Sequence, residues 1–183
     1  MSLVESISVE MGNEAKNFSL KGVDGKKHSL SDYTEARALV LIFMCNHCPY
    51  VQAIWGRLNA LQDRFADRGL QLIGINPNTA NEGYEEESFE KMKDYAREYE
   101  MNFPYLEDKD QSVSKLYQAQ CTPDIYLYNS ERKLVYHGRL DDSWRDGEGV
   151  QKEDLALAIE TLLDGGTPNE DQVSSMGCSI KWK

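Results

Sequence analysis

Two of the four cysteines in the chain, Cys45 and Cys48, are separated only by Asn46 and His47. Cysteine thiolates are nucleophiles and soft metal ligands, so this spacing fits three kinds of site: a redox-active dithiol, half of a metal site, or two inert core thiols. The six residues before the motif, 38–43, are all apolar and predict a strand buried on both faces. After the motif, apolar residues recur at helical spacing. We therefore expect the motif where a buried strand passes into a helix.

This expected position favours redox chemistry. We predict that Cys45 lies at or near the N-terminal cap of the helix, where unpaired backbone N–H groups stabilise a thiolate. Cys48 then lies one turn further along the same face, close enough for a disulfide. Pro49 is tolerated in a first helical turn, because few intrahelical hydrogen bonds are lost there. The sequence thus predicts that Cys45 attacks a substrate disulfide and that Cys48 resolves the mixed disulfide.

The two alternatives to a redox dithiol have less support from the sequence. A structural zinc site needs four ligands, usually two closely spaced pairs, and the other two cysteines, Cys121 and Cys178, lie far apart in the chain. Inert thiols are harder to reconcile with a helix N-terminus, where a sulfur is poorly hidden. We therefore predict no metal site. A copper(I) metallochaperone, binding the ion through the close pair and a histidine, remains the alternative from another class of protein.

Four further residues are candidates for tuning or assisting the dithiol. Asn46 and His47 lie between the cysteines, and a protonated His47 would favour the Cys45 thiolate by charge, unless it is an ordinary exposed residue. Cys121 is either close to the dithiol or a buried thiol of the core. Cys178 could return to the site as a second resolving cysteine or pair with Cys121, because connectivity cannot be deduced from sequence. Both are treated as possible accessory thiols.

The pattern of apolar residues predicts the elements that position these side chains. Asp24-Gly25 indicates a β-hairpin near the N-terminus. Further elements are predicted as strands at 38–43 and 70–75, helices at 51–65, 89–99 and 113–117, an extended segment at 103–106, a strand pair at 125–128 and 134–137, and a helix at 154–163. Strands joined through helices, followed by a strand pair, predict an α/β fold with a mixed central sheet flanked by helices. We expect a single domain over 1–183, with a core of about 13–165 and a C-terminal tail over 166–183.

Composition narrows the classes of partner. The chain has 183 residues, a formal net charge of −11 and 40% hydrophobic residues, and its Lys and Arg residues form no dense cluster. Nucleic acid and anionic membranes are therefore not expected as partners. No apolar run approaches the ~18 residues of a membrane span, and the first ten residues lack the features of a secretory signal. If Met1 is the native start, the expected location is the cytoplasm, where paired cysteines are more often catalytic than structural.

Four separated motifs carry a resemblance to a known family. A strand, a Cys-x-x-Cys motif and a helix, followed downstream by Cys121-Thr122-Pro123-Asp124 before a hairpin, resemble the thioredoxin fold. The N-terminal segments 15–20 and 24–26 resemble the entry hairpin of peroxiredoxins and redoxins. Together with segments 138–143 and 177–183, they make the chain similar to a peroxiredoxin-like subgroup of the alkyl hydroperoxide reductase/thiol-specific antioxidant group. This resemblance implies a thioredoxin-like fold with an N-terminal β-hairpin extension and a C-terminal tail. It also implies a cis peptide bond at Pro123, with Thr122 and Pro123 presenting their backbone to the substrate.

Two departures from the family pattern shape the expected activity. Peroxiredoxins carry Pro-x-x-x-Thr-x-x-Cys, whereas here Leu41 stands in place of the proline, Cys45 in place of the threonine, and Cys48 at the peroxidatic position. In addition, the strand before Cys45 lacks the buried aspartate of thioredoxins. We therefore expect a thiol–disulfide oxidoreductase in cell redox homeostasis, with an antioxidant thiol peroxidase as the alternative. Its expected partners are protein or small-molecule thiols and disulfides and an unidentified reductant, with no cofactor.

Overall fold

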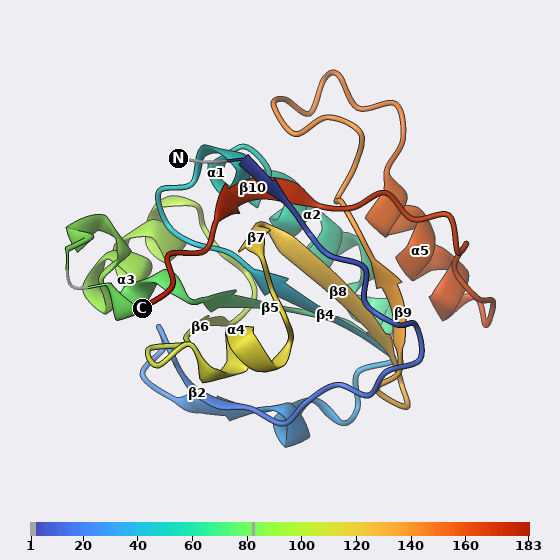
Figure 1. Cartoon of the computed structure of the whole chain (residues 1–183). Coiled ribbons are helices and arrows are strands. Elements are labelled where there is room, and N and C mark those ends of the chain that lie inside the picture. Colours follow the sequence, from blue (N-terminus) through green and yellow to red (C-terminus); the bar gives the residue numbers. More distant parts are fainter. Residues whose placement is uncertain (1–2, 82) are drawn as a thin grey trace.

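A mixed seven-stranded sheet forms the centre of the protein (Figure 1). The computed structural model describes residues 3–81 and 83–183. The strand order is β3-β2-β6-β5-β4-β8-β9, with bounds β2 Ser19–Gly22, β3 Lys27–Ser29, β4 Ala38–Phe43, β5 Leu70–Asn76, β6 Tyr105–Glu107, β8 Asp124–Asn129 and β9 Leu134–His137. Strand β4 pairs in parallel with β5 and antiparallel with β8, so the predicted mixed sheet and its central buried strand are confirmed.

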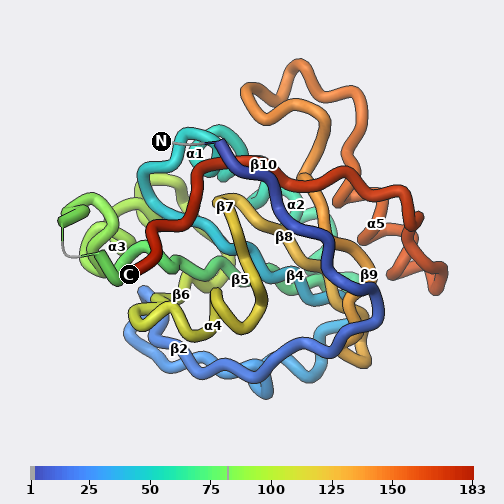
Figure 2. The backbone as a smooth tube through the Cα atoms, in the orientation of Figure 1, coloured from blue at the N-terminus to red at the C-terminus, as the bar shows by residue number. Residues whose placement is uncertain are grey.

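A second sheet joins both ends of the chain to the centre and was not predicted. It has the order β1-β10-β7, with β1 over Leu3–Glu5, β10 over Met176–Ser179 and β7 over Cys121–Thr122. Figure 2 shows the N-terminal and C-terminal segments running side by side across the top of the molecule. The predicted C-terminal tail therefore contains a strand that is paired on both of its edges.

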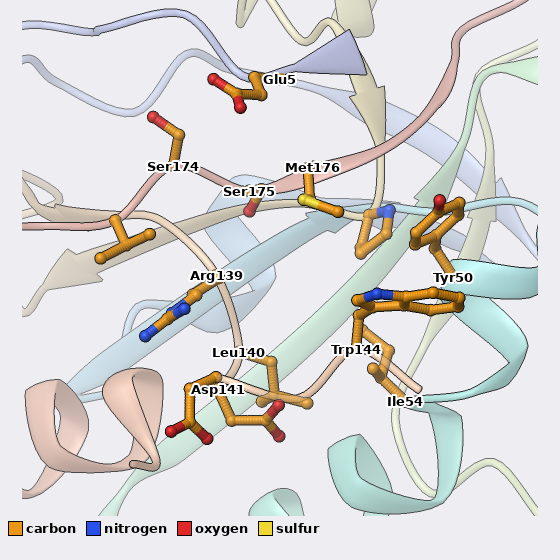
Figure 3. Close-up of a pocket in the computed structure, with 13 residues that line it drawn as sticks. Glu5, Tyr50, Ile54, Arg139, Leu140, Asp141, Trp144, Ser174, Ser175 and Met176 are labelled. Atoms are coloured by element: carbon orange, nitrogen blue, oxygen red, sulfur yellow. The ribbon is translucent and has the colours of Figure 1, made fainter. Parts of the chain in front are cut away.

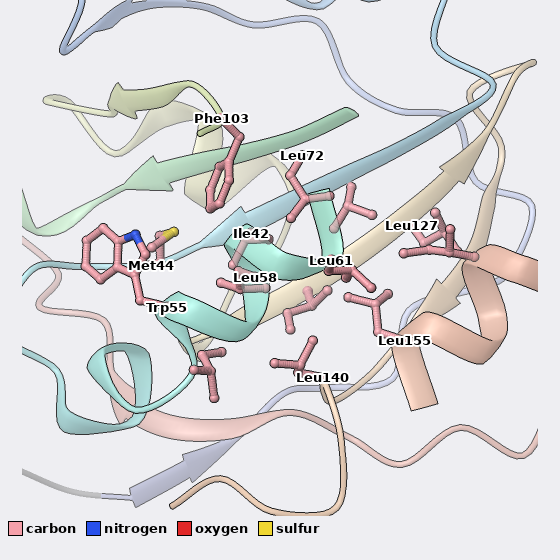
Figure 4. Packing of buried hydrophobic residues seen from close by; sticks show 14 of the residues in the cluster. Ile42, Met44, Trp55, Leu58, Leu61, Leu72, Phe103, Leu127, Leu140 and Leu155 are labelled. Carbon is pink, nitrogen blue, oxygen red and sulfur yellow. The ribbon is translucent and has the colours of Figure 1, made fainter. Parts of the chain in front are cut away.

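Helices cover both faces of the central sheet. Strand β4 contributes alternate residues to two cores, with Val40 and Ile42 on one face and Leu39 and Leu41 on the other. The first face packs against α2 (Trp55–Phe65), α3 (Phe89–Glu98) and α5 (Asp154–Leu163), and Figure 4 shows side chains of this core. The other face packs against α4 (Ser112–Leu116) and the N-terminal segment. Among the residues that the structure describes, none of the helices has the length and apolarity to cross a bilayer.

The helix predicted after the cysteine motif is interrupted. It consists of α1 (Pro49–Gln52) and α2, with a turn at Ala53 and Ile54 between them. Gly56, a poor helix former, follows the break, and the Arg57 guanidinium donates a hydrogen bond to the carbonyl of Ala53.

Short 3-10 turns complete the connections: η1 Leu30–Tyr33, η2 Ala66–Arg68, η3 Asn78–Ala80 and η4 Glu85–Glu87. The predicted hairpin at Asp24-Gly25 and the predicted helix at 154–163 are confirmed.

The core between α2 and the sheet is expected to dominate stability. Leu58 is fully buried there, so Leu58→Ala should lower the free energy of unfolding by ~2–5 kcal/mol through lost apolar contact and a residual cavity. Leu157 on α5 is 56% exposed, and Leu157→Ala should change stability by less than ~0.5 kcal/mol. Urea unfolding of the reduced protein, followed by circular dichroism, measures both. Equal small losses in the two variants would contradict this packing.

Candidate redox site

The cysteine motif lies at the end of the central strand, as predicted, but the helix begins later than expected. Strand β4 ends at Phe43, residues 44–48 form an irregular turn, and α1 starts at Pro49 with Cys48 as its N-cap. Proline suits the first helical position because it has no N–H to leave unpaired. The sequence predicts Cys45 at or near the N-cap, but Cys45 lies three residues before it, and the backbone donors of the first turn face Cys48.

Both cysteines contact the segment before β8. The Cys45 sulfur lies 3.3 Å from the Thr122 hydroxyl oxygen, and the Cys48 sulfur lies 3.2 Å from the Thr122 carbonyl oxygen. The peptide bond between Thr122 and Pro123 is cis, as the resemblance implied. Each of the two cysteines is only 1% exposed. A substrate therefore reaches this dithiol only if a covering segment moves.

Cys48 is the more acidic of the two thiols. A hydrogen bond from the Cys45 side chain lowers the pKa of Cys48 to about 5, against the opposing effect of burial. The side chain and backbone N–H of Cys178 and the backbone N–H of Val51 also donate to its sulfur. The Thr122 carbonyl, 3.2 Å away, opposes ionisation, but it is one acceptor against four donors. The environment thus stabilises a Cys48 thiolate at neutral pH.

The environment of Cys45 has the opposite effect. Its hydrogen bond to Cys48, its burial and the nearby Glu87 carboxylate raise the pKa of Cys45 well above its usual value. Since the two cysteines share a proton, a low pKa at Cys48 and a high pKa at Cys45 describe one coupled pair. The two directions favour a proton on Cys45 and a thiolate on Cys48.

A buried carboxylate, Glu87, holds the cysteine motif in place. It is fully buried, and its oxygens accept hydrogen bonds from the backbone N–H groups of Asn46 (2.9 Å) and His47 (3.1 Å) and from the Asn76 side chain (3.0 Å). Sequence reasoning missed this residue, because it ends a run of three glutamates in a polar loop that resembles solvated surface. It supplies the buried carboxylate that the strand before Cys45 lacks.

Asn46 and His47 point at this carboxylate network. The Asn46 side chain donates to the Glu86 carbonyl (2.8 Å) and accepts from the Tyr105 hydroxyl (2.8 Å), and it is fully buried. The His47 ring forms an ion pair or hydrogen bond with Glu87. His47 is thus neither a plain surface residue nor a direct partner of a cysteine sulfur in the contacts of the described residues. Its ring therefore contacts Glu87 and reaches the cysteines through that carboxylate.

Of the two possible accessory cysteines, Cys178 lies at the dithiol, whereas Cys121 forms no hydrogen bond to it among the residues that the structure describes. The Cys178 sulfur lies 2.8 Å from the Cys48 sulfur, which brings a third thiol to the dithiol. The Cys121 sulfur instead contacts the Pro123 carbonyl at 3.4 Å, and burial raises its pKa. Within the described part of the chain, no group of three or more His, Cys, Asp and Glu side chains is arranged to hold a metal ion.

A cavity of about 450 Å³ opens beside the cis proline (Figure 3). Its lining includes Pro123 and Met176, together with Tyr50, which follows the cysteine motif by two residues. The rings of Tyr50 and Trp144 lie against each other with centroids 4.4 Å apart, and Trp144 is 38% exposed. Sequence analysis missed both aromatic residues as site candidates, since neither belongs to a spaced motif. They form an apolar wall next to the redox centre.

The fold and the site define a thioredoxin-like protein, and a comparison with known structures supports this class. The thioredoxin domain of a thiol-disulfide oxidoreductase from Bacteroides vulgatus superposes with a TM-score of 0.65 at 19% identity, over 85% of this chain and 99% of that domain. The model of the AhpC/TSA family matches residues 11–137, so the chain belongs to the AhpC/TSA family. The resemblance to the alkyl hydroperoxide reductase/thiol-specific antioxidant group is therefore confirmed at the level of the family.

Two relatives extend the comparison. The thiol-disulfide oxidoreductase ResA of Bacillus thuringiensis subsp. konkukian is 24% identical over 127 residues, which cover 69% of this chain and 68% of ResA. An uncharacterised conserved protein from Geobacillus kaustophilus has a crystal structure that matches with a TM-score of 0.93 at 42% identity. That match covers 100% of this chain and 97% of the other, so it includes the C-terminal strand.

The charge of Glu87 should set the redox potential of the site. Glu87→Gln keeps an oxygen acceptor but removes a negative charge beside the dithiol, and that charge repels the thiolate that only the reduced pair carries. The reduced form is stabilised, and the potential should rise by about 30 mV, equivalent to ~1.4 kcal/mol for a two-electron couple. His47→Gly, which removes the partner of Glu87, should shift the potential in the opposite direction.

Equilibration against glutathione buffers at pH 7 measures both shifts. Glu86→Gln is the matched control, because the Glu86 side chain is 54% exposed and its contact with the motif uses the backbone carbonyl. A shift in Glu87→Gln no larger than that in Glu86→Gln would show that Glu87 has only a structural role.

Proposed function

We propose that this protein is a thiol–disulfide oxidoreductase whose redox centre is the Cys45–Cys48 dithiol. One observation carries the proposal: two hydrogen-bonded thiols both contact Thr122, and the pKa of one of them is lowered to about 5. A thiolate stable at neutral pH is the form that attacks a disulfide, and the neighbouring thiol completes the exchange. The ResA relative, named a thiol-disulfide oxidoreductase, supports the same activity.

We assign the attack to Cys48, where the sequence alone favoured Cys45. The Cys48 thiolate attacks one sulfur of a substrate disulfide, and the other substrate sulfur leaves as a thiolate. The Cys45 thiol then gives up its proton and attacks the Cys48 sulfur, which releases the second substrate thiol and forms the Cys45–Cys48 disulfide. The substrate's disulfide gains two electrons and the protein's dithiol loses two. The reverse direction uses the same atoms.

Substrate contacts are assigned to Pro123 and the adjoining cavity. The backbone edge of Thr122 is paired with β10, so a partner chain approaches from the side of the cavity, which Pro123, Tyr50 and Trp144 help to line. Thr122 retains a role through its hydroxyl and carbonyl contacts to the two cysteines. The apolar wall suits a disulfide next to an aromatic or aliphatic residue, in a protein or a small molecule.

Regeneration of the reduced dithiol needs a thiol reductant, and we propose the cytoplasm as a compartment that supplies one.

A thiol peroxidase is the second candidate, favoured by membership of the AhpC/TSA family and by the acidic Cys48. In that reaction the Cys48 thiolate would attack a peroxide oxygen and become a sulfenic acid, which Cys45 would convert to a disulfide with loss of water. The position of Cys45, where peroxiredoxins have the threonine that orients peroxide, disfavours this role.

Turnover of a disulfide substrate tests the proposed function. With dithiothreitol as reductant, the wild type should reduce the disulfides of insulin, whereas Cys48→Ser should fall to the uncatalysed rate because it lacks the attacking thiolate. Cys121→Ser, which changes a buried thiol outside the dithiol, is the matched control and should keep most of the activity. Replacing insulin with hydrogen peroxide measures the second candidate in the same variants.

Two outcomes would contradict these assignments. Activity in Cys48→Ser close to that of the wild type would exclude Cys48 as the attacking residue. A stable mixed disulfide on Cys45 in that variant would return the attack to Cys45.

A further inference from the structure

A third cysteine lies against the sulfur that the proposed mechanism uses first. The sulfurs of Cys48 and Cys178 are 2.8 Å apart, although 130 residues separate them in the chain. A disulfide bond is ~2.04 Å long, so the pair consists of two thiols in contact. Cys48 therefore has a thiol neighbour on each of two sides, Cys45 from its own turn and Cys178 from the C-terminal strand.

The position of Cys178 is fixed by backbone pairing. Strand β10 pairs antiparallel with β7, which sets Cys178 opposite Thr122, and its other edge pairs with β1 (Figure 2). The close approach of β10 to β7 needs a glycine at position 177, because a Cβ atom there would lie 2.0 Å from the Thr122 carbonyl oxygen. A two-sided pairing with this register delivers the Cys178 sulfur to the redox centre reproducibly.

Strand β10 also covers the redox centre. It pairs with the backbone edge of Thr122, and it helps to bury Cys48. Cys178 itself is 4% exposed. The C-terminal strand thus holds its cysteine against Cys48 on the side of the Thr122 backbone edge.

We propose that Cys178 is a third redox-active thiol of the site, which forms a disulfide with Cys48 in competition with Cys45. This inference rests on the proposed function and names a second route of resolution for it. In a mixed disulfide between Cys48 and substrate, the Cys178 sulfur attacks the Cys48 sulfur, and its proton passes to the departing substrate thiolate. The Cys48–Cys178 disulfide forms as the bond from Cys48 to substrate breaks.

The same step interconverts the two oxidised forms. When the Cys178 sulfur attacks Cys48 in a Cys45–Cys48 disulfide, the Cys48–Cys178 bond forms, the Cys45–Cys48 bond breaks, and the proton of Cys178 moves to Cys45. The protein's oxidation state does not change. In the second form, Cys45 is a thiol again and the C-terminal strand is covalently tied to α1. Burial and the neighbouring Cys48 raise the pKa of Cys178 to about 12, so Cys178 resolves rather than attacks first.

Trapping in a Cys45→Ser background tests the proposal. The reduced full-length variant is mixed with oxidised glutathione, quenched with acid, alkylated and digested, and its peptides are identified by mass spectrometry. We expect a Cys48–Cys178 cross-linked peptide and only transient glutathione on Cys48. In Cys45→Ser/Cys178→Ser the glutathione adduct on Cys48 should persist at least ten times longer, whereas Cys45→Ser/Cys121→Ser should behave like Cys45→Ser.

A second variant keeps the thiol and moves its strand. Cys45→Ser/Gly177→Ala retains Cys178 but prevents the close approach to Thr122, so the cross-link should form at least ten times more slowly. Equal lifetimes of the Cys48 adduct with and without Cys178, and no Cys48–Cys178 peptide, would overturn this inference while leaving the proposed function intact. Absence of any glutathione adduct on Cys48 in every variant would instead overturn both.

Discussion

The hydrogen bonds that converge on the sulfur of Cys48 link the remote parts of this protein. Donors come from the Cys45 side chain in the same turn, from the first turn of α1 and from strand β10 at the other end of the chain. The Thr122 carbonyl completes the contacts from the segment before β8. The donors from three segments stabilise a thiolate and the Thr122 carbonyl opposes it, so four segments that meet at one atom determine its reactivity. The second sheet, β1-β10-β7, brings Cys178 and Thr122 to this sulfur.

A buried glutamate acts on the other cysteine of the pair, Cys45. Glu87 fixes the turn through two backbone N–H groups, while its charge disfavours a thiolate at Cys45. The negative charge of the reduced pair is therefore directed away from Cys45 and toward Cys48. His47 contacts the carboxylate and adjusts how strongly it acts. Glu87 thus orients the cysteine motif and also directs the negative charge of the reduced pair toward Cys48.

The local pattern of the chain predicted most of the central sheet but not the closure of the site. The continuous apolar run at 38–43 and the helical spacing of apolar residues at 154–163 are strong local signals, and both became the observed elements. The short strands β1, β7 and β10 have two to four residues and no alternating pattern, so only long-range pairing creates them. The contact of Cys178 with Cys48 and the burial of Glu87 also depend on residues distant in the chain, so no local sequence pattern predicts them. The N-cap was misplaced by three residues because a turn separates β4 from α1.

The ultraviolet absorbance of thiolate, titrated against pH in the reduced protein, tests the central claim that Cys48 carries the charge of the site. The account predicts one thiolate per chain appearing with a midpoint near pH 5, the value to which the pKa of Cys48 is lowered. This signal should vanish in Cys48→Ser and remain in Cys45→Ser and Cys121→Ser, with a higher midpoint in Cys45→Ser, where one donor is lost. A low-pH thiolate that survives in Cys48→Ser and disappears in Cys45→Ser would contradict the account.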